Sequence, residues 1–389
     1  MLPRRLLFFI DRIEGASDPA TDDGYALLYR AFVRARRCGD EIYVAYPETP
    51  WTRGPDGHVY AFAHRVLSFR ASPYAWFTDE QPACHAVSDE LTLELDTLDA
   101  VIWQLSSGNA ERNRQLLRAL ARVEQHTLVY PSPRFALDPR LGAKVLPGLA
   151  DPHFTPKTHH TAGYAADGCR IGARDKARRA VTFLREALGS AGTAIVKPLH
   201  GAHGVGVHVL GVDPRTGRIG TALDDVAALC ELLERYGDLV VQEYIASLRD
   251  EQFGEVRFSL IDGEIPRTAT GKPCRVPRRV PTPDSLLADS GVPSGSELTQ
   301  PELEFVTRLG ALYRQWGIHC GGGDLIRTPE PERPFVFIDA AQWVSGDAVV
   351  TGVLNGEPYG VVDAVLDSID RQIQRRGDEV RTLAQLSTV

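Results

Sequence analysis

Apolar runs alternate with stretches of helical periodicity along the first third of the chain. Buried strands are predicted by four such runs, at residues 6–10, 41–45, 99–103 and 127–130. Leu28 and Phe32 recur at helical spacing after the first run, as do Leu116 and Leu120 after the third. Strands that alternate with helices indicate a parallel sheet with helices on its faces. We therefore expect residues 1–125 to form an α/β, Rossmann-like domain, although residues 50–95 give no clear pattern.

A proline-rich segment, residues 131–139, separates this part from the rest of the chain. A helix is predicted beyond it at 173–188, and strands are predicted at 194–198, 239–245, 255–262, 321–326 and 335–339. These elements suggest two further domains, over residues 126–241 and 242–389.

Local signals refine the last of these domains. An Asp262-Gly263 pair at the end of a strand predicts a tight hairpin turn. Thr299 and Glu302 form a capping box that opens a helix, and a final helix is expected over 361–375. Residues 271–298 are rich in Pro, Arg and Ser, which predicts a long mobile loop.

One of the predicted strands delivers a lysine directly into a glycine-rich turn. Lys197 ends an apolar run and is followed by Gly201, Gly204 and Gly206. Glycines allow the backbone to approach an anion, successive N–H groups can bind phosphate oxygens, and a lysine adds positive charge. A flexible hairpin with a surface lysine would show the same pattern. Only five of the 43 Lys and Arg residues are lysines, which favours the phosphate-binding interpretation.

Composition excludes several functions. The net charge of −8 argues against a general nucleic-acid binder. The first apolar run ends at Asp11, which is too short for a signal peptide, and no stretch approaches the roughly 20 apolar residues of a membrane span. The six cysteines are widely spaced, as expected for free thiols in a reducing cytoplasm.

The order of the polar motifs resembles that of a known superfamily. Lys197 with its glycine turn comes first, then Gln242-Glu243-Tyr244-Ile245, then Glu255 with Arg257, and finally Asp324 and Asp339. In this order the chain resembles the ATP-grasp superfamily, and specifically the prokaryotic glutathione synthetases, over nearly its whole length. The resemblance implies an ATP-grasp fold, α+β in its nucleotide-binding part, preceded by a Rossmann-like (pre-ATP-grasp) domain.

The resemblance also implies an ATP site between two subdomains. Phosphates would contact Lys144 and Lys197, and the strand at Gln242–Ile245 would be the hinge that binds adenine. Glu255 would bind the ribose. The implied ATP-binding set is Lys144, Lys197, His200, Gly201, His203, Gly204, Gly206, Gln242, Glu243, Tyr244, Ile245 and Glu255. The implied ligands of Mg²⁺, for which Mn²⁺ could substitute, are Asp324, Asp339 and Gln342.

The implied reaction joins a carboxylate to an amine through an acyl phosphate, releasing ADP and phosphate. Arg257, Lys272 and Arg275 would stabilise the transferring phosphoryl group or bind a substrate carboxylate. The implied substrate contacts are Asp11, Gln104, Ser106 and Arg278. A solvated, salt-bridged loop is the alternative for the arginines. The expected partners are small amino-acid or dipeptide substrates and, in a cytoplasmic homo-oligomer, one or three further copies of the chain.

Three segments depart from the family pattern. His200 and His203 replace Asp and Gly, and they are either phosphate donors or solvated loop residues. Ala341 replaces an Asn, so Gln342 or water would complete the metal site. Residues 103–107 replace a basic substrate-contacting segment, which points to altered substrates. The hypotheses left open are an amino-acid ligase of specialised metabolism, glutathione synthetase itself, and a non-catalytic ATP-binding regulator.

Overall fold

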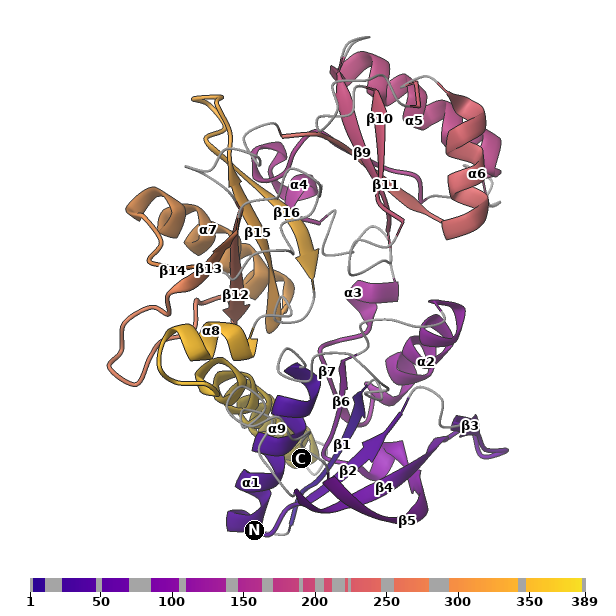
Figure 1. Cartoon of the computed structure of the whole chain (residues 1–389). Helices are drawn as coiled ribbons and strands as arrows, with labels where there is room; N and C mark the ends of the chain where they lie inside the picture. Colours follow the sequence, from indigo (N-terminus) through magenta and orange to yellow (C-terminus); the bar gives the residue numbers. More distant parts are fainter. Residues whose placement is uncertain are drawn as a thin grey trace.

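The computed structural model of the chain contains three β-sheets (Figure 1). It describes residues 3–10, 23–46, 51–69, 85–104, 110–137, 146–162, 171–188, 192–199, 206–211, 221–222, 225–245, 255–279, 294–341 and 348–386.

The N-terminal sheet has a parallel centre, as the sequence predicted. Its strands β1 (Arg5–Ile10), β2 (Glu41–Ala45), β6 (Ala100–Gln104) and β7 (Leu128–Tyr130) are joined in the order β2-β1-β6-β7. Helices α1 (Asp23–Cys38) and α2 (Ala110–Val123) connect them. The Rossmann-like arrangement is confirmed.

Three antiparallel strands extend this sheet within residues 50–95, for which no element was predicted. They are β3 (Trp51–Arg53), β4 (Val59–Phe69) and β5 (His85–Glu94). In β4 the inward residues are Val59, Ala61 and Ala63, whereas Tyr60 and Phe62 between them are half-buried. Apolar side chains on both faces hide the period-two alternation by which a strand is usually recognised.

The last helix of the chain covers the first domain. Helix α9 (Gly360–Leu386) is longer than the predicted 361–375, and it packs with α1 and α8 (Ala348–Leu354) on one face of the N-terminal sheet (Figure 1). Ion pairs link α1 to α9. One of them is bidentate, because Arg30 donates to the two carboxylate oxygens of Asp363 at 3.0 and 2.7 Å. The opposite face packs on α2.

The middle sheet is antiparallel, with strand order β10-β9-β11-β8. Its strands are β8 (Thr158–His160), β9 (Thr193–Pro198), β10 (His208–Gly211) and β11 (Leu239–Glu243). Helices α5 (Ala173–Leu188) and α6 (Val226–Tyr236) cover one face, where they bury Val196 and Val241. Three short helices lie before this sheet: α3 (Arg134–Leu137), α4 (Leu146–Ala150) and a 3₁₀ turn at Pro152–Phe154.

The C-terminal sheet is also antiparallel, in the order β14-β13-β12-β15-β16. Its strands are β12 (Glu255–Ile261), β13 (Val276–Arg279), β14 (Ser294–Ser296), β15 (Cys320–Arg327) and β16 (Phe335–Ala341), and α7 (Gln300–Trp316) covers one face. The expected loop at 271–298 is therefore wrong for β13 and β14, while residues 280–293 of it lie outside the described residues. Val276 is buried in the core, and the backbone of β13 pairs with β12 and β14.

Two local predictions in this domain are confirmed. Asp262 and Gly263 have positive φ angles of 51° and 74°, as a type I′ turn requires. Ile261 and Glu264 exchange backbone hydrogen bonds of 2.8 and 3.0 Å around them. The capping box is formed as well, because Glu302 accepts the Thr299 N–H at 2.8 Å. The domain boundaries at 125 and 241 remain predictions.

Candidate functional site

The middle and C-terminal sheets each leave one face uncovered by their helices (Figure 1). In the middle sheet, residues that alternate with buried Val196 and Val241 lie on this open face, and they include Lys197 and Gln242. In the C-terminal sheet, Glu255 and Arg257 lie on the face opposite Val256 and Phe258 by the same alternation. Three of the predicted nucleotide-binding residues, Lys197, Gln242 and Glu255, thus lie on faces that the described helices leave uncovered.

Lys197 and Gly206 bracket the glycine-rich turn. Lys197 lies near the end of β9 with 7% of its surface exposed, opposite Val240 of β11. Gly206 precedes β10 with a φ of 76°. A Cβ atom there would lie 2.8 Å from Pro198 Cγ and 3.0 Å from Tyr236 Cε1, so only glycine fits.

The predicted hinge lies at the end of β11. Gln242 is buried and donates to Thr158 Oγ1 at 2.9 Å. The N–H of Glu243 donates to the Lys157 carbonyl at 2.9 Å, so it is not available to a purine as an N–H donor. Ile245 is buried against Ile326 and Val336 of the C-terminal sheet. The hinge therefore ends on an apolar surface shared between the sheets.

Two carboxylates converge on one guanidinium in the C-terminal sheet. Register places Arg257 of β12 opposite Asp324 of β15. Arg257 Nε and Nη2 donate to the two Asp324 carboxylate oxygens at 2.7 and 3.0 Å, and Nη2 lies 3.5 Å from Glu255 Oε1. Both acids are almost fully buried. Carboxylate oxygens are ligands that Mg²⁺ prefers, and a guanidinium can bind phosphate, but here both oxygens of Asp324 are paired with Arg257.

The strand β16 carries a β-bulge at the second predicted metal position. Asp324 pairs with Ile338, whereas Gly322 pairs with Ala341, so one extra residue of β16 lies between these pairs. Asp339 falls within this irregularity. Bulges redirect side chains and are common beside functional sites.

The predicted cationic residues of the 272–278 segment do not gather around Arg257. Arg278 is turned to the helix-covered face, where it donates to buried Glu302 at 3.2 Å. Arg275 donates to the Gly295 carbonyl at 2.6 Å, and its N–H donates to Asn355 Oδ1 at 2.8 Å. Lys272 is exposed. Among the contacts described above, only those of Arg257 reach Glu255 and Asp324; those of Arg275 and Arg278 lie elsewhere.

Several predicted site residues lie outside the described residues: Asp11, Ser106, Lys144, His200, Gly201, His203, Gly204 and Gln342. Gln104 is described at the carboxyl end of β6, where ligands of open α/β sheets usually bind. Its Oε1 is buried and accepts no hydrogen bond from the described residues.

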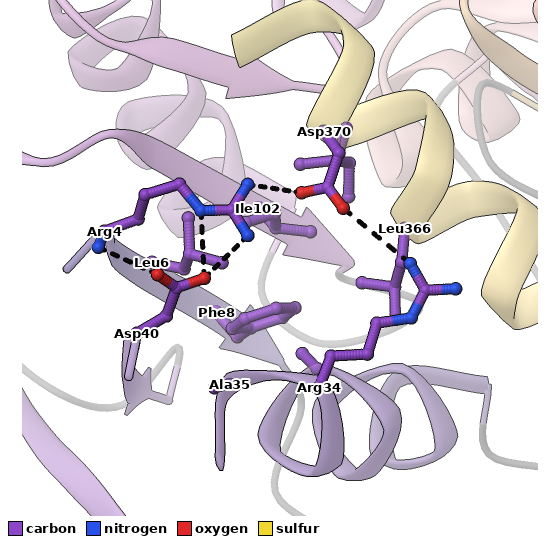
Figure 2. Close-up of a pocket in the computed structure, with 11 residues that line it drawn as sticks. Arg4, Leu6, Phe8, Arg34, Ala35, Asp40, Ile102, Leu366 and Asp370 are labelled. Atoms are coloured by element: carbon purple, nitrogen blue, oxygen red, sulfur yellow. Dashed lines mark hydrogen bonds and ion pairs between the residues drawn. The ribbon is translucent and has the colours of Figure 1, made fainter. Parts of the chain in front are cut away.

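A small cavity lies away from these residues, between β1, α1 and α9 (Figure 2). Its volume of about 20 Å³ suits about one water molecule. Arg4 closes it by bonding Asp40 at 2.6–2.9 Å and Asp370 at 2.6 Å. We interpret it as a packing gap at the α1–α9 contact.

The residue that the sequence analysis missed is Arg333. It is buried in the turn between β15 and β16, and it donates to Glu243 of the hinge at 3.0 Å. Its local sequence, Pro329-Glu-Pro-Glu-Arg333-Pro334, signals only a turn.

Comparison with known proteins defines the fold. No protein-family profile matches the sequence, and no curated protein is a significant match to it. Solved structures are similar over the whole chain. A D-cycloserine synthetase has a TM-score of 0.56 at 16% identity, covering 94% of this chain and 99% of its own. The D-alanine–D-alanine ligase from Coxiella burnetii has a TM-score of 0.54 at 12% identity, covering 100% and 99%.

A third structure, the VanG D-Ala:D-Ser ligase from Enterococcus faecalis, has a TM-score of 0.52 at 14% identity, covering 95% of this chain and 100% of its own. The three sheets and these similarities establish a three-domain ATP-grasp fold, the fold of carboxylate–amine ligases. At such low identity the similarity concerns the fold alone.

Proposed function

We propose that the protein is an ATP- and Mg²⁺-dependent carboxylate–amine ligase that forms an amide bond between small amino-acid substrates. The observation that carries the proposal is the Glu255–Arg257–Asp324 cluster on the open face of an ATP-grasp sheet. It places acidic oxygens and a guanidinium together where the fold would hold the triphosphate.

Each residue of the open faces has a role in this proposal. Lys197 neutralises phosphate charge, and Ile245 with Ile326 supports the purine ring. Asp324 and Asp339 would hold Mg²⁺, and Mn²⁺ could replace it; the ion supplies charge neutralisation for the phosphates. Arg257 pairs with Asp324 and can turn toward the transferring phosphoryl group as a substrate carboxylate attacks it. An amine then displaces phosphate from the acyl phosphate.

Amino acids are the proposed substrates because the similar structures are named as a D-cycloserine synthetase, a D-Ala:D-Ser ligase and a D-alanine–D-alanine ligase. Gln104 has a buried oxygen at the carboxyl edge of the N-terminal sheet, where an ammonium group could donate to it. Exposed Lys272 and Arg275 are the proposed contacts of the substrate carboxylate, which Arg275 could reach only by leaving the Gly295 carbonyl. Arg278 could join them only by leaving Glu302.

A phosphate-release screen tests this proposal. Pairs of L- and D-amino acids are incubated with ATP and Mg²⁺, and ADP, AMP and phosphate are measured. We expect ADP and phosphate only when an acid and an amine are both present. AMP and pyrophosphate would contradict the acyl-phosphate mechanism.

The Lys197→Ala variant tests the placement of the triphosphate. We expect ATP affinity to fall about tenfold or more, because a buried cation near phosphate is removed. Unchanged affinity and turnover would contradict the placement. Arg178→Ala, on the exposed outer surface of α5, is the control.

Two alternatives have defined outcomes in the same assays. Turnover of γ-glutamylcysteine with glycine would identify a glutathione synthetase, the branch that the motif order resembles. ATP binding without turnover of any pair would indicate a non-catalytic regulator. A cytoplasmic dimer or tetramer remains the expected assembly.

A further inference from the structure

The chain connects the middle and C-terminal sheets through two segments that meet at one carboxylate. The first segment runs from Phe154, which packs in the C-terminal core against Phe305, to Lys157, which leads into β8. The second leaves β11 at Glu243. The Glu243 Oε2 atom accepts the Lys157 N–H at 3.3 Å and Arg333 Nη2 at 3.0 Å. One side chain therefore joins both connections.

Arg333 binds this carboxylate from the C-terminal sheet. It is 6% exposed. Its Nε and Nη2 donate to the two oxygens of Glu330 at 3.1 and 2.9 Å, and its Nη1 lies 3.5 Å from the Thr155 carbonyl. The turn is itself fixed, because the Arg333 N–H donates to the Glu330 carbonyl at 3.0 Å. Because Glu330 binds both Nε and Nη2, the guanidinium is held in place to bind Glu243 through Nη2.

This contact lies between the hinge and the strands that carry the metal-binding acids. Ile245, two residues after Glu243, packs on Ile326 and Val336 of β15 and β16. The turn holding Arg333 joins those same two strands, which also contain Asp324 and Asp339. Fixing Glu243 to this turn thus fixes the hinge relative to the acids.

We propose that Arg333 is a positioning residue that holds both connections through Glu243 and so orients the hinge for the ATP purine. This inference rests on the proposed function of the hinge. It concerns a residue that touches neither phosphate nor substrate, and its effect should be confined to nucleotide binding.

The test compares Arg333→Gln, Glu243→Gln and the double variant, with Arg314→Gln as a matched control. Arg314 donates to the Gly263 carbonyl at the end of β12 and pairs with Glu264, so its described partners lie outside the hinge. Mg²⁺–ADP affinity is measured by calorimetry, and KM values are measured for ATP and for each amino-acid substrate.

We expect each single variant to weaken ADP binding and raise the KM for ATP by about tenfold, since small misplacements of a binding segment are costly. The amino-acid KM values should change less than twofold. The double variant should be no worse than the singles, because both remove one contact. Arg314→Gln should bind ADP like the unmodified protein.

Additive losses in the double variant, or unchanged ADP affinity in Arg333→Gln, would overturn the inference. So would equal changes in all KM values, which indicate general loosening. If Arg333→Gln does not fold, Arg333→Lys and Glu243→Gln carry the same comparison. Failure of the unmodified protein to bind ADP would instead overturn the proposed function, so the two failures are distinct.

Discussion

Asp262 shows how one side chain can connect distant parts of this chain. It accepts hydrogen bonds from Ser368 at 2.9 Å and from Arg371 at 2.6 and 3.2 Å, and it pairs with His319 at 3.0 Å. Tyr130 of the first domain donates to Ser368 at 3.2 Å. Burial alone would raise the pKa of Asp262, but the hydrogen bonds from His319, Arg371 and Ser368 lower it to about 2.

This lowered pKa predicts how stability depends on pH. The ionised form is favoured by folding, so its contribution is present above the ordinary pKa of 3.8 and is lost as pH falls toward about 2. Asp262→Asn keeps the tolerance for positive φ but removes the charge. At pH 7 we expect it to cost about 1–2 kcal/mol, after allowance for partial exposure. Urea unfolding of both proteins should show the difference shrinking between pH 4 and 2; a constant difference would contradict the account.

Gly206 permits a prediction about the strand after the glycine-rich turn. Gly206→Ala adds a Cβ that collides with Pro198 and Tyr236, whereas Gly237→Ala has the same φ of 76° but open space. We expect Gly237→Ala to cost about 1 kcal/mol from backbone strain, and Gly206→Ala to cost about 1–3 kcal/mol more. Chemical denaturation measures both. Equal costs would show that the neighbours move aside easily.

At the scale of elements, most helices and strands could be predicted from periodicity and terminal signals. The capping box of α7 could be predicted because Thr299 and Glu302 are three residues apart. The arginine partners of Glu302 could not be predicted. Arg278 and Arg327 reach it from β13 and β15 at 3.2 and 3.6 Å, and a single sequence contains no signal for such long-range pairs. The antiparallel strand β4 was missed because both of its faces carry apolar residues.

Glu302 therefore has two separable roles. Thr299→Ala removes only the cap and should cost about 1 kcal/mol. Glu302→Gln preserves an acceptor for the cap but leaves two half-buried arginines without their carboxylate, and should cost about 2–3 kcal/mol. Thermal and urea unfolding would distinguish them. Similar costs for the two variants would mean that the arginines contribute little to stability.

At the scale of the molecule, the order of the motifs resembled that of the ATP-grasp superfamily, and the three sheets and the similar solved structures establish that fold. The candidate site was only partly predictable. Lys197, Glu255, Arg257 and Asp324 lie on sheet faces that the described helices leave uncovered, whereas Arg278 faces the helix-covered side. The direction of a side chain depends on strand register, and residues 276–279 were expected to be loop. The role of Arg333 could not be predicted, because it depends on a tertiary contact with Glu243 for which a single sequence carries no signal.

The position of α9 leads to a prediction for the whole chain. Although α9 is the last element, Val365 and Ile369 are buried in the core beneath β1 and α1. The first domain should therefore depend on residues more than 350 positions away. Ile369→Ala leaves a cavity in this core and should cost about 2–4 kcal/mol. Hydrogen exchange should show lost protection in β1 and β2, with little change in the middle sheet.

Gln374→Ala is the control, because Gln374 lies on the exposed side of the same helix. It should leave exchange in β1 unchanged, since helical propensity is preserved and no core contact is lost. A fragment of residues 1–125 lacks α9 altogether and should show no cooperative unfolding, because only α1 is left to cover one face of its sheet. If that fragment folds with full protection of β1, the first domain is independent, and α9 serves only to fasten the C-terminal sheet to it.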